Sequence, residues 1–122
     1  MAIRTFTQLN TWQQGHKFVL LIYEITGKFP NSEKFGLVNQ MRRAAVSVTS
    51  NIAEGFCRNS RKEKIQFYRT SLGSLTEIQN QLIIAKDLAL IKYEDFEKDF
   101  EQSVTVSKLI NGLIKSAASF SR

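Results

Sequence analysis

Few side chains in this sequence have the types and the spacing that catalysis or metal binding requires. The chain of 122 residues contains one histidine, His16, and one cysteine, Cys57. Glu54 has the chemistry of a general base, and Asn51 lies one turn before it to hold a substrate. No second carboxylate, metal ligand or nucleophile is spaced to help Glu54. The sequence therefore predicts no catalytic residue, no metal site and no cofactor, and we do not expect an enzyme.

Asn51 and Glu54 also have a structural interpretation. With Ser47 and Arg58 they follow one another at intervals of three or four residues, so in a helix they form one polar strip. If this strip is buried, it must be hydrogen-bonded throughout. His16, from an earlier segment, is the expected partner of Glu54 or Asn51. We therefore predict that His16, Asn51 and Glu54 form a structural polar network.

The formal net charge of +6 comes from one third of the chain. Between Lys28 and Arg69 there are nine basic residues and three acidic ones, and the remainder is balanced. Such a local excess is typical of a surface that meets a polyanion, although a solvated basic face that only maintains solubility gives the same pattern. The predicted phosphate contacts are Arg42, Arg43, Arg58, Arg61, Lys62 and Lys64. Nucleic-acid binding of this kind is weakly sequence-specific and strongly salt-dependent.

Four segments with apolar residues at helical spacing must position these side chains. The predicted helices span about residues 10–28, 35–56, 60–89 and 94–119, and a capping box at Ser60 to Glu63 opens the third. Short links between amphipathic helices favour an all-α fold, an antiparallel up-down-up-down four-helix bundle. Residues 1–122 are expected to form a single domain. Gly73, in the middle of the third helix, predicts close approach by a neighbouring element.

The first of these helices has more apolar surface than one bundle core can cover. Residues 18–25 are apolar at every position but one. If Trp12, Val19 and Tyr23 form the core stripe, three other apolar side chains point away from it: Phe18, Leu21 and Ile25. An exposed apolar patch marks an interface, so the sequence predicts a homo-oligomer through these three residues. The alternative is that the first helix lies deeper in its own bundle.

No segment of the sequence predicts membrane insertion or secretion. The apolar run FVLLIYEI, residues 18–25, is far shorter than the roughly 20 residues of a membrane-spanning helix. The N-terminal MAIRTFTQLN lacks the apolar core and cleavage site of a secretory signal. Cys57 has no partner for an intramolecular disulfide, which fits a reducing compartment. The expected location is the cytoplasm.

Several short motifs within about residues 9–91 resemble those of a known family. They are Trp12-Gln13, Tyr23-Glu24, Phe29-Pro30, Gly36-Leu37, QMRRAA at 40–45, SNIAEG at 50–55 and Leu72-Gly73-Ser74-Leu75. On these motifs the chain resembles the bacterial four-helix bundle family first described as proteins encoded in intervening sequences of 23S rRNA genes. It departs from the family pattern at Thr49, where proline is common, and at Cys57, where glycine is common.

The resemblance implies a four-helix bundle that assembles as a ring-like homopentamer. The chain is also similar to the accessory variability protein of diversity-generating retroelements, a basic pentamer that binds a reverse transcriptase and nucleic acid. We therefore expect a non-enzymatic, basic, oligomeric protein that binds RNA or DNA through backbone phosphates, with a link to 23S rRNA intervening sequences. The alternative is a protein-interaction scaffold whose basic face docks an acidic partner, such as a reverse transcriptase or polymerase.

Overall fold

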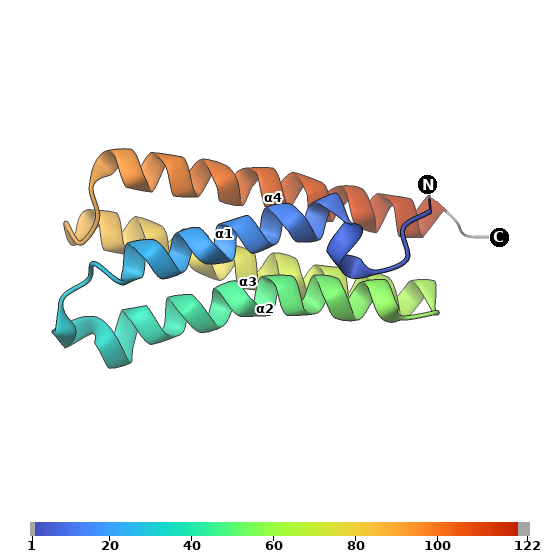
Figure 1. Cartoon of the computed structure of the whole chain (residues 1–122), viewed down its shortest axis with the longest axis horizontal. Coiled ribbons are helices and arrows are strands. Elements are labelled where there is room, and N and C mark those ends of the chain that lie inside the picture. Colours follow the sequence, from blue (N-terminus) through green and yellow to red (C-terminus); the bar gives the residue numbers. More distant parts are fainter. Residues whose placement is uncertain (1, 120–122) are drawn as a thin grey trace.

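A computed structural model of the chain describes residues 2–119, which form a bundle of four long helices (Figure 1). The helices are α1 (Asn10–Thr26), α2 (Asn39–Cys57), α3 (Arg61–Asp87) and α4 (Tyr93–Ser119). A 3-10 turn, η1 (Phe6–Gln8), precedes α1, and a 3-10 turn, η2 (Asn31–Glu33), leads into a π-helical turn, η3 (Lys34–Val38), before α2. The π-helical turn explains why α2 begins later than residue 35, the start expected from the sequence.

Successive helices run antiparallel, so the start of α1, the α2–α3 turn and the end of α4 lie at one end of the bundle (Figure 1). Helix α1 packs against α2 and α4, and α3 packs against the same two helices. Helices α1 and α3 therefore face each other diagonally. The described residues contain no strand, which confirms the predicted all-α class and fits the four-helix bundle. In residues 2–119, no helix combines the length and the apolar character that crossing a membrane demands.

The apolar residues of α2 that recur every three or four positions are buried, at Met41, Ala44, Val48 and Ile52. Small side chains beside this stripe allow α3 to approach α2 closely. The hydroxyls of Ser47 and Ser74 are hydrogen-bonded at 2.8 Å, and the Ser71 hydroxyl donates to the Val48 carbonyl at 2.7 Å. The α2–α3 contact is therefore both tight and satisfied in its hydrogen bonds.

The predicted core stripe of α1 is right at Val19, which is buried, and at Trp12, which packs against the core, but it is wrong at Tyr23. Phe18 and Ile25 are buried and Leu21 is half-buried, whereas Tyr23 is 42% exposed. An apolar run as dense as residues 18–25 fits two stripes equally well, so spacing alone does not choose between them. The side of α1 that faces α2 is the one that contains Gly15, where the helices approach closely. An added Cβ at Gly15 would lie 3.1 Å from the Thr49 side chain of α2. The proposed oligomer interface at Phe18, Leu21 and Ile25 is thus mostly core, and the alternative of a more deeply placed helix holds.

Two expectations for α3 also fail. Helix α3 ends at Asp87, before the expected end near residue 89, and Ala89 turns the chain with a φ of 60°. The Leu90 amide donates to the Ala85 carbonyl and the Ala89 amide to the Lys86 carbonyl, which is a Schellman termination. Gly73 is exposed, and nothing lies within 4 Å of a Cβ built on it. No other part of the described chain approaches Gly73 closely.

Candidate nucleic-acid interface

The antiparallel topology collects positive charge at one end of the bundle. We define the basic end as residues 2–17, 49–73 and 107–119, which include the start of α1, the α2–α3 turn and the end of α4 (Figure 1). Its basic residues are Arg4, Lys17, Arg58, Arg61, Lys62, Lys64, Arg69, Lys108 and Lys115, and its acidic residues are Glu54 and Glu63. The other half of the described chain has seven basic and nine acidic residues. The molecule is therefore strongly polarised from end to end.

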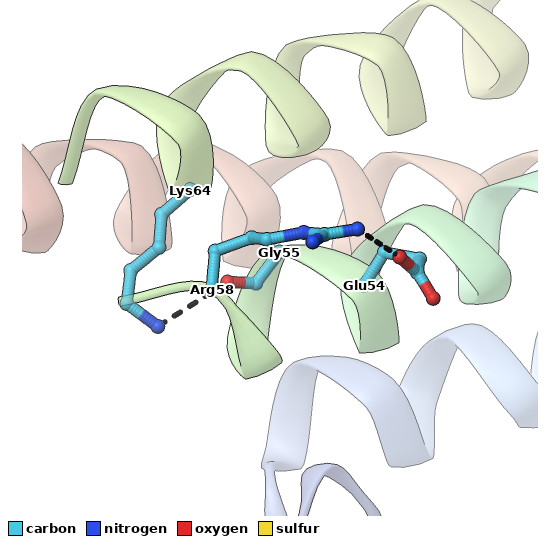
Figure 2. A network of polar contacts seen from close by, with 4 residues as sticks. All are labelled: Glu54, Gly55, Arg58 and Lys64. Atoms are coloured by element: carbon cyan, nitrogen blue, oxygen red, sulfur yellow. Dashed lines mark hydrogen bonds and ion pairs between the residues drawn. The ribbon is translucent and has the colours of Figure 1, made fainter. Parts of the chain in front are cut away.

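Two of the predicted phosphate contacts bind the protein itself at the α2–α3 turn (Figure 2). The Arg58 Nη2 lies 2.6 Å from the Glu54 Oε1, and its guanidinium lies 4.8 Å from the centre of the Phe67 ring. The Lys64 Nζ donates to the carbonyls of Gly55 and Phe56, at 3.2 and 2.7 Å. Lys64 thus caps the carboxyl end of α2, where its positive charge also interacts favourably with the negative end of the helix dipole.

Arg42 has a similar structural role at the other end of the bundle. Its Nε donates to the Thr26 hydroxyl at 2.9 Å, and its Nη2 donates to the Tyr23 carbonyl at 3.2 Å. The guanidinium also lies over the Tyr23 ring, 4.6 Å from its centre. These contacts satisfy the last turn of α1 and leave Arg42 half-buried. Arg42 is therefore a helix cap first, and its availability to a phosphate is reduced.

The three remaining predicted contacts are exposed, but the structure does not bring them together. Arg61 and Lys62 form the first turn of α3 at the basic end. Arg43 belongs to the first turns of α2, at the opposite end, where it lines an open hollow of about 290 Å³ with Gln40, Ala44 and Glu77. At 1.5 Å per residue, α2 separates Arg43 from Arg58 by roughly 22 Å. A single basic surface can contain Arg61 and Lys62 without Arg43.

The predicted network of His16, Asn51 and Glu54 does not form. The Asn51 side-chain amide donates to the Ser47 carbonyl and hydroxyl, at 2.8 and 3.1 Å, and Glu54 pairs with Arg58. His16 is exposed and stacks on Trp12, with 4.8 Å between ring centres. The imidazole therefore stays at the surface beside Trp12, while Asn51 and Glu54 find their partners in α2 and at Arg58. The polar strip is satisfied locally by α2 and Ser74 instead.

Sequence reasoning missed two features, one at the basic end and one in the other half of the bundle. Arg4, Lys17, Lys108 and Lys115 join the basic end from segments whose local charge is balanced, and only the packing order reveals them. The second feature is Asp99 in α4, which is 2% exposed and whose Oδ1 has no hydrogen-bond partner among the described residues. Burial raises the pKa of the Asp99 carboxyl from 3.8 to about 6. Within residues 2–119, no group of three or more His, Cys, Asp or Glu residues is placed so that it could hold a metal ion.

Fold and charge together define a class: small all-helical bundle proteins with one strongly basic end. The family model of the 23S rRNA-intervening sequence protein matches residues 7–112, so the chain belongs to that family. A crystal structure of a protein with unknown function from the S23 ribosomal protein family of Bacteroides thetaiotaomicron has the same fold, with a TM-score of 0.80. The two chains are 24% identical, and the match covers 86% of this chain and 95% of that one. A search of curated proteins found no match.

Proposed function

We propose that this protein is a non-enzymatic, oligomeric nucleic-acid-binding protein that contacts backbone phosphates through its basic end. The observation that carries the proposal is the concentration of nine basic and two acidic residues in that half of the described bundle. A surface of this kind attracts a polyanion and releases its bound counterions. Because the family is named for an intervening sequence of 23S rRNA, RNA is the first ligand to test.

Arg61, Lys62 and Arg69 are the contacts that the proposal assigns first. All three are exposed on the first turns of α3, at the basic end of the bundle. Arg58 and Lys64 support them, because they hold the α2–α3 turn and still contribute to the local field. Phosphate contacts position a nucleic acid but do not read its sequence. Binding is therefore weakly sequence-specific.

The proposal includes self-association into the ring-like homopentamer that the family resemblance implies. A ring would multiply the basic ends and raise avidity for a long polyanion without new contacts in each copy. Since Phe18 and Ile25 are buried, we assign the contact to another apolar patch, formed by Ile83, Ile84 and Leu88 on the last turns of α3. These aliphatic side chains are 39%, 40% and 59% exposed, as expected for residues that a second copy covers.

The decisive experiment measures RNA and DNA binding by the full chain across a salt series. The double variant Arg61→Glu, Lys62→Glu is expected to weaken binding and to reduce the slope of log affinity against log salt by about two. The matched control is Arg43→Glu, Lys92→Glu, which makes the same change in net charge on exposed residues of the opposite end. This control should bind almost as the wild type does.

The outcomes separate a local site from general attraction. Equal weakening by both double variants would show that net charge, rather than the basic end, carries the binding. Wild-type protein that binds neither RNA nor DNA would refute the proposal. An acidic protein that stays bound after nuclease treatment would point to the scaffold function, since a partner bridged by RNA would be released.

A further inference from the structure

Three aromatic rings cluster at the start of α1, within the basic end. The rings of Trp12 and His16 are stacked, with 4.8 Å between their centres and 13° between their planes. Phe6 of η1 contacts Trp12 edge-to-face, with 5.4 Å between centres and 67° between planes. Turn η1 itself packs on both α1 and α2. The stack is therefore held on the body of the bundle and does not depend on a loose terminal segment.

The two stacked rings differ in how well the protein covers them. Trp12 is half-buried and packs against the edge of the hydrophobic core. His16 is exposed, and the next turn of α1 continues outward with Leu20, which is 57% exposed. Because Trp12 is fixed by its contacts with Phe6 and the core, it holds the His16 ring at a defined angle. The result is a preformed aromatic surface that a planar ligand can reach.

We propose that the Trp12–His16 stack is a platform for an unpaired base, so that the protein prefers single-stranded nucleic acid. This inference rests on the proposed function. Proteins that bind single strands combine a positive surface that follows the backbone with aromatic rings on which bases stack. Here Lys17 follows His16 directly and Arg4 precedes Phe6, so cations flank the rings on both sides in the sequence. A base in a duplex is already stacked on its neighbours and cannot take this place.

The chemistry of the platform fits a base better than it fits a phosphate. Stacking on an aromatic ring accepts any base because each has a π face, which agrees with weak sequence specificity. The rings give up little conformational freedom on binding, since the Trp12 side chain is already packed. The salt-dependent phosphate contacts of α3 and the salt-independent stacking on α1 are then separate contributions to one binding site.

Trp12 is the only tryptophan in the chain, so its fluorescence reports directly on the platform. The first measurement titrates the full-length protein with a thymidylate oligonucleotide of about 12 nucleotides, within the usual site size. The second uses an abasic oligonucleotide of the same length, which presents the same phosphates without bases. The thymidylate strand is expected to quench Trp12 emission, and the abasic strand to bind without quenching.

A second set of variants tests the affinity itself by anisotropy of labelled oligonucleotides. His16→Ala should weaken binding of the thymidylate strand by roughly 5- to 100-fold, the loss of one stacked base, and leave the abasic strand unaffected. His16→Phe should restore most of the affinity. Gln66→Ala is the matched control, an exposed residue at the basic end on α3, diagonally across the bundle from α1. Its affinity for both strands should equal that of the wild type.

The outcomes distinguish this inference from the function on which it rests. If the abasic strand binds and the thymidylate strand neither binds more tightly nor quenches Trp12, the stacking platform is wrong and the phosphate interface stands. If His16→Ala binds the thymidylate strand as the wild type does, the platform is equally wrong. If neither strand binds the wild type, the proposed function fails, and the platform fails with it.

Discussion

Individual cations in this chain serve two different purposes, and sequence alone does not separate them. Arg42 and Lys64 donate to backbone carbonyls at the carboxyl ends of α1 and α2. Arg61 and Lys62 lie on the first turn of α3, where a positive charge opposes the helix dipole and does not stabilise the helix. The first pair therefore contributes to folding, whereas the second pair is exposed at the basic end. A charge count cannot distinguish them, because it contains no information on which carbonyls lie nearby.

The buried carboxyl of Asp99 makes the stability of the fold depend on pH. The pKa of its carboxyl is raised to about 6, mainly by desolvation; Lys98 and Lys28 lower this pKa, and Asp95 and Glu24 help to raise it. The folded state thus holds the Asp99 proton more tightly than the unfolded state does. Asp99 favours folding at low pH, and this stability is lost as the pH rises from about 4 to about 7. Since one pKa unit corresponds to about 1.4 kcal/mol, the loss is at most about 3 kcal/mol.

Asp99→Asn removes this titration and serves as the test. The free energy of unfolding, measured with urea between pH 4 and pH 7.5, should improve for Asp99→Asn relative to the wild type as the pH rises. Glu101→Gln is the control, because Glu101 is exposed on the same helix and is not among the charges that shift the pKa of Asp99. Parallel pH profiles for the wild type and Asp99→Asn would contradict the assignment.

For the helices, the sequence predicted features that depend on one helix alone. It failed for features that depend on the contact between two helices. The buried face of α2 follows from the spacing of its apolar residues, since these positions are sparse and fit only one face. The stripe of α1 was only partly right, because residues 18–25 are apolar on nearly every side and spacing did not show that Phe18 and Ile25 belong to the core. The buried side of α1 is the one on which Gly15 approaches Thr49, and this is a contact between two helices. Similarly, nothing in the sequence showed that His16 would stack on Trp12 instead of joining Asn51.

A pair of glycines tests how closely the helices pack. A Cβ at Gly55 would lie 2.6 Å from the buried ring of Tyr68, so α2 or α3 must shift to admit it. Gly55→Ala should destabilise the protein by about 1 to 3 kcal/mol. A Cβ at Gly73 meets nothing within 4 Å. Gly73→Ala should therefore stabilise α3 by up to about 1 kcal/mol, through helix propensity alone.

Both variants make the same chemical change in the middle or last turn of a helix, so each controls for the other. Urea unfolding followed by circular dichroism measures the two free energies. Opposite signs are expected. A Gly73→Ala variant that loses as much stability as Gly55→Ala would mean that α3 has a close neighbour at Gly73 that the single chain does not show.

At the scale of the whole molecule, topology decides where the charge lies. The sequence located the positive excess between Lys28 and Arg69, but the antiparallel order divides that segment between the two ends of the bundle. Arg43 goes to the end with more acidic residues, and Lys108 and Lys115 join Arg61 and Lys62. Four of the six predicted contacts therefore lie at the basic end, and two of these, Arg61 and Lys62, are exposed. The rest of the basic end could not be predicted from local charge, because the contributing residues are up to about a hundred positions apart in the chain.

The exposed apolar patch of Ile83, Ile84 and Leu88 can be tested as a contact between copies. If copies associate through Ile83, Ile84 and Leu88, an acidic side chain there is left without water or a counter-ion in the contact and opposes association. Ile84→Asp should then sediment as a single chain of 14.0 kDa, while the wild type sediments as five copies. Leu20→Asp makes the same change on an exposed aliphatic residue of α1 and should leave the assembly intact. Dissociation by Leu20→Asp but not by Ile84→Asp would move the contact to α1, and a wild type that sediments as one chain would exclude the ring.

Because a ring raises avidity, Ile84→Asp should also bind long RNA more weakly than wild type, while its affinity for a strand short enough to occupy one basic end stays unchanged.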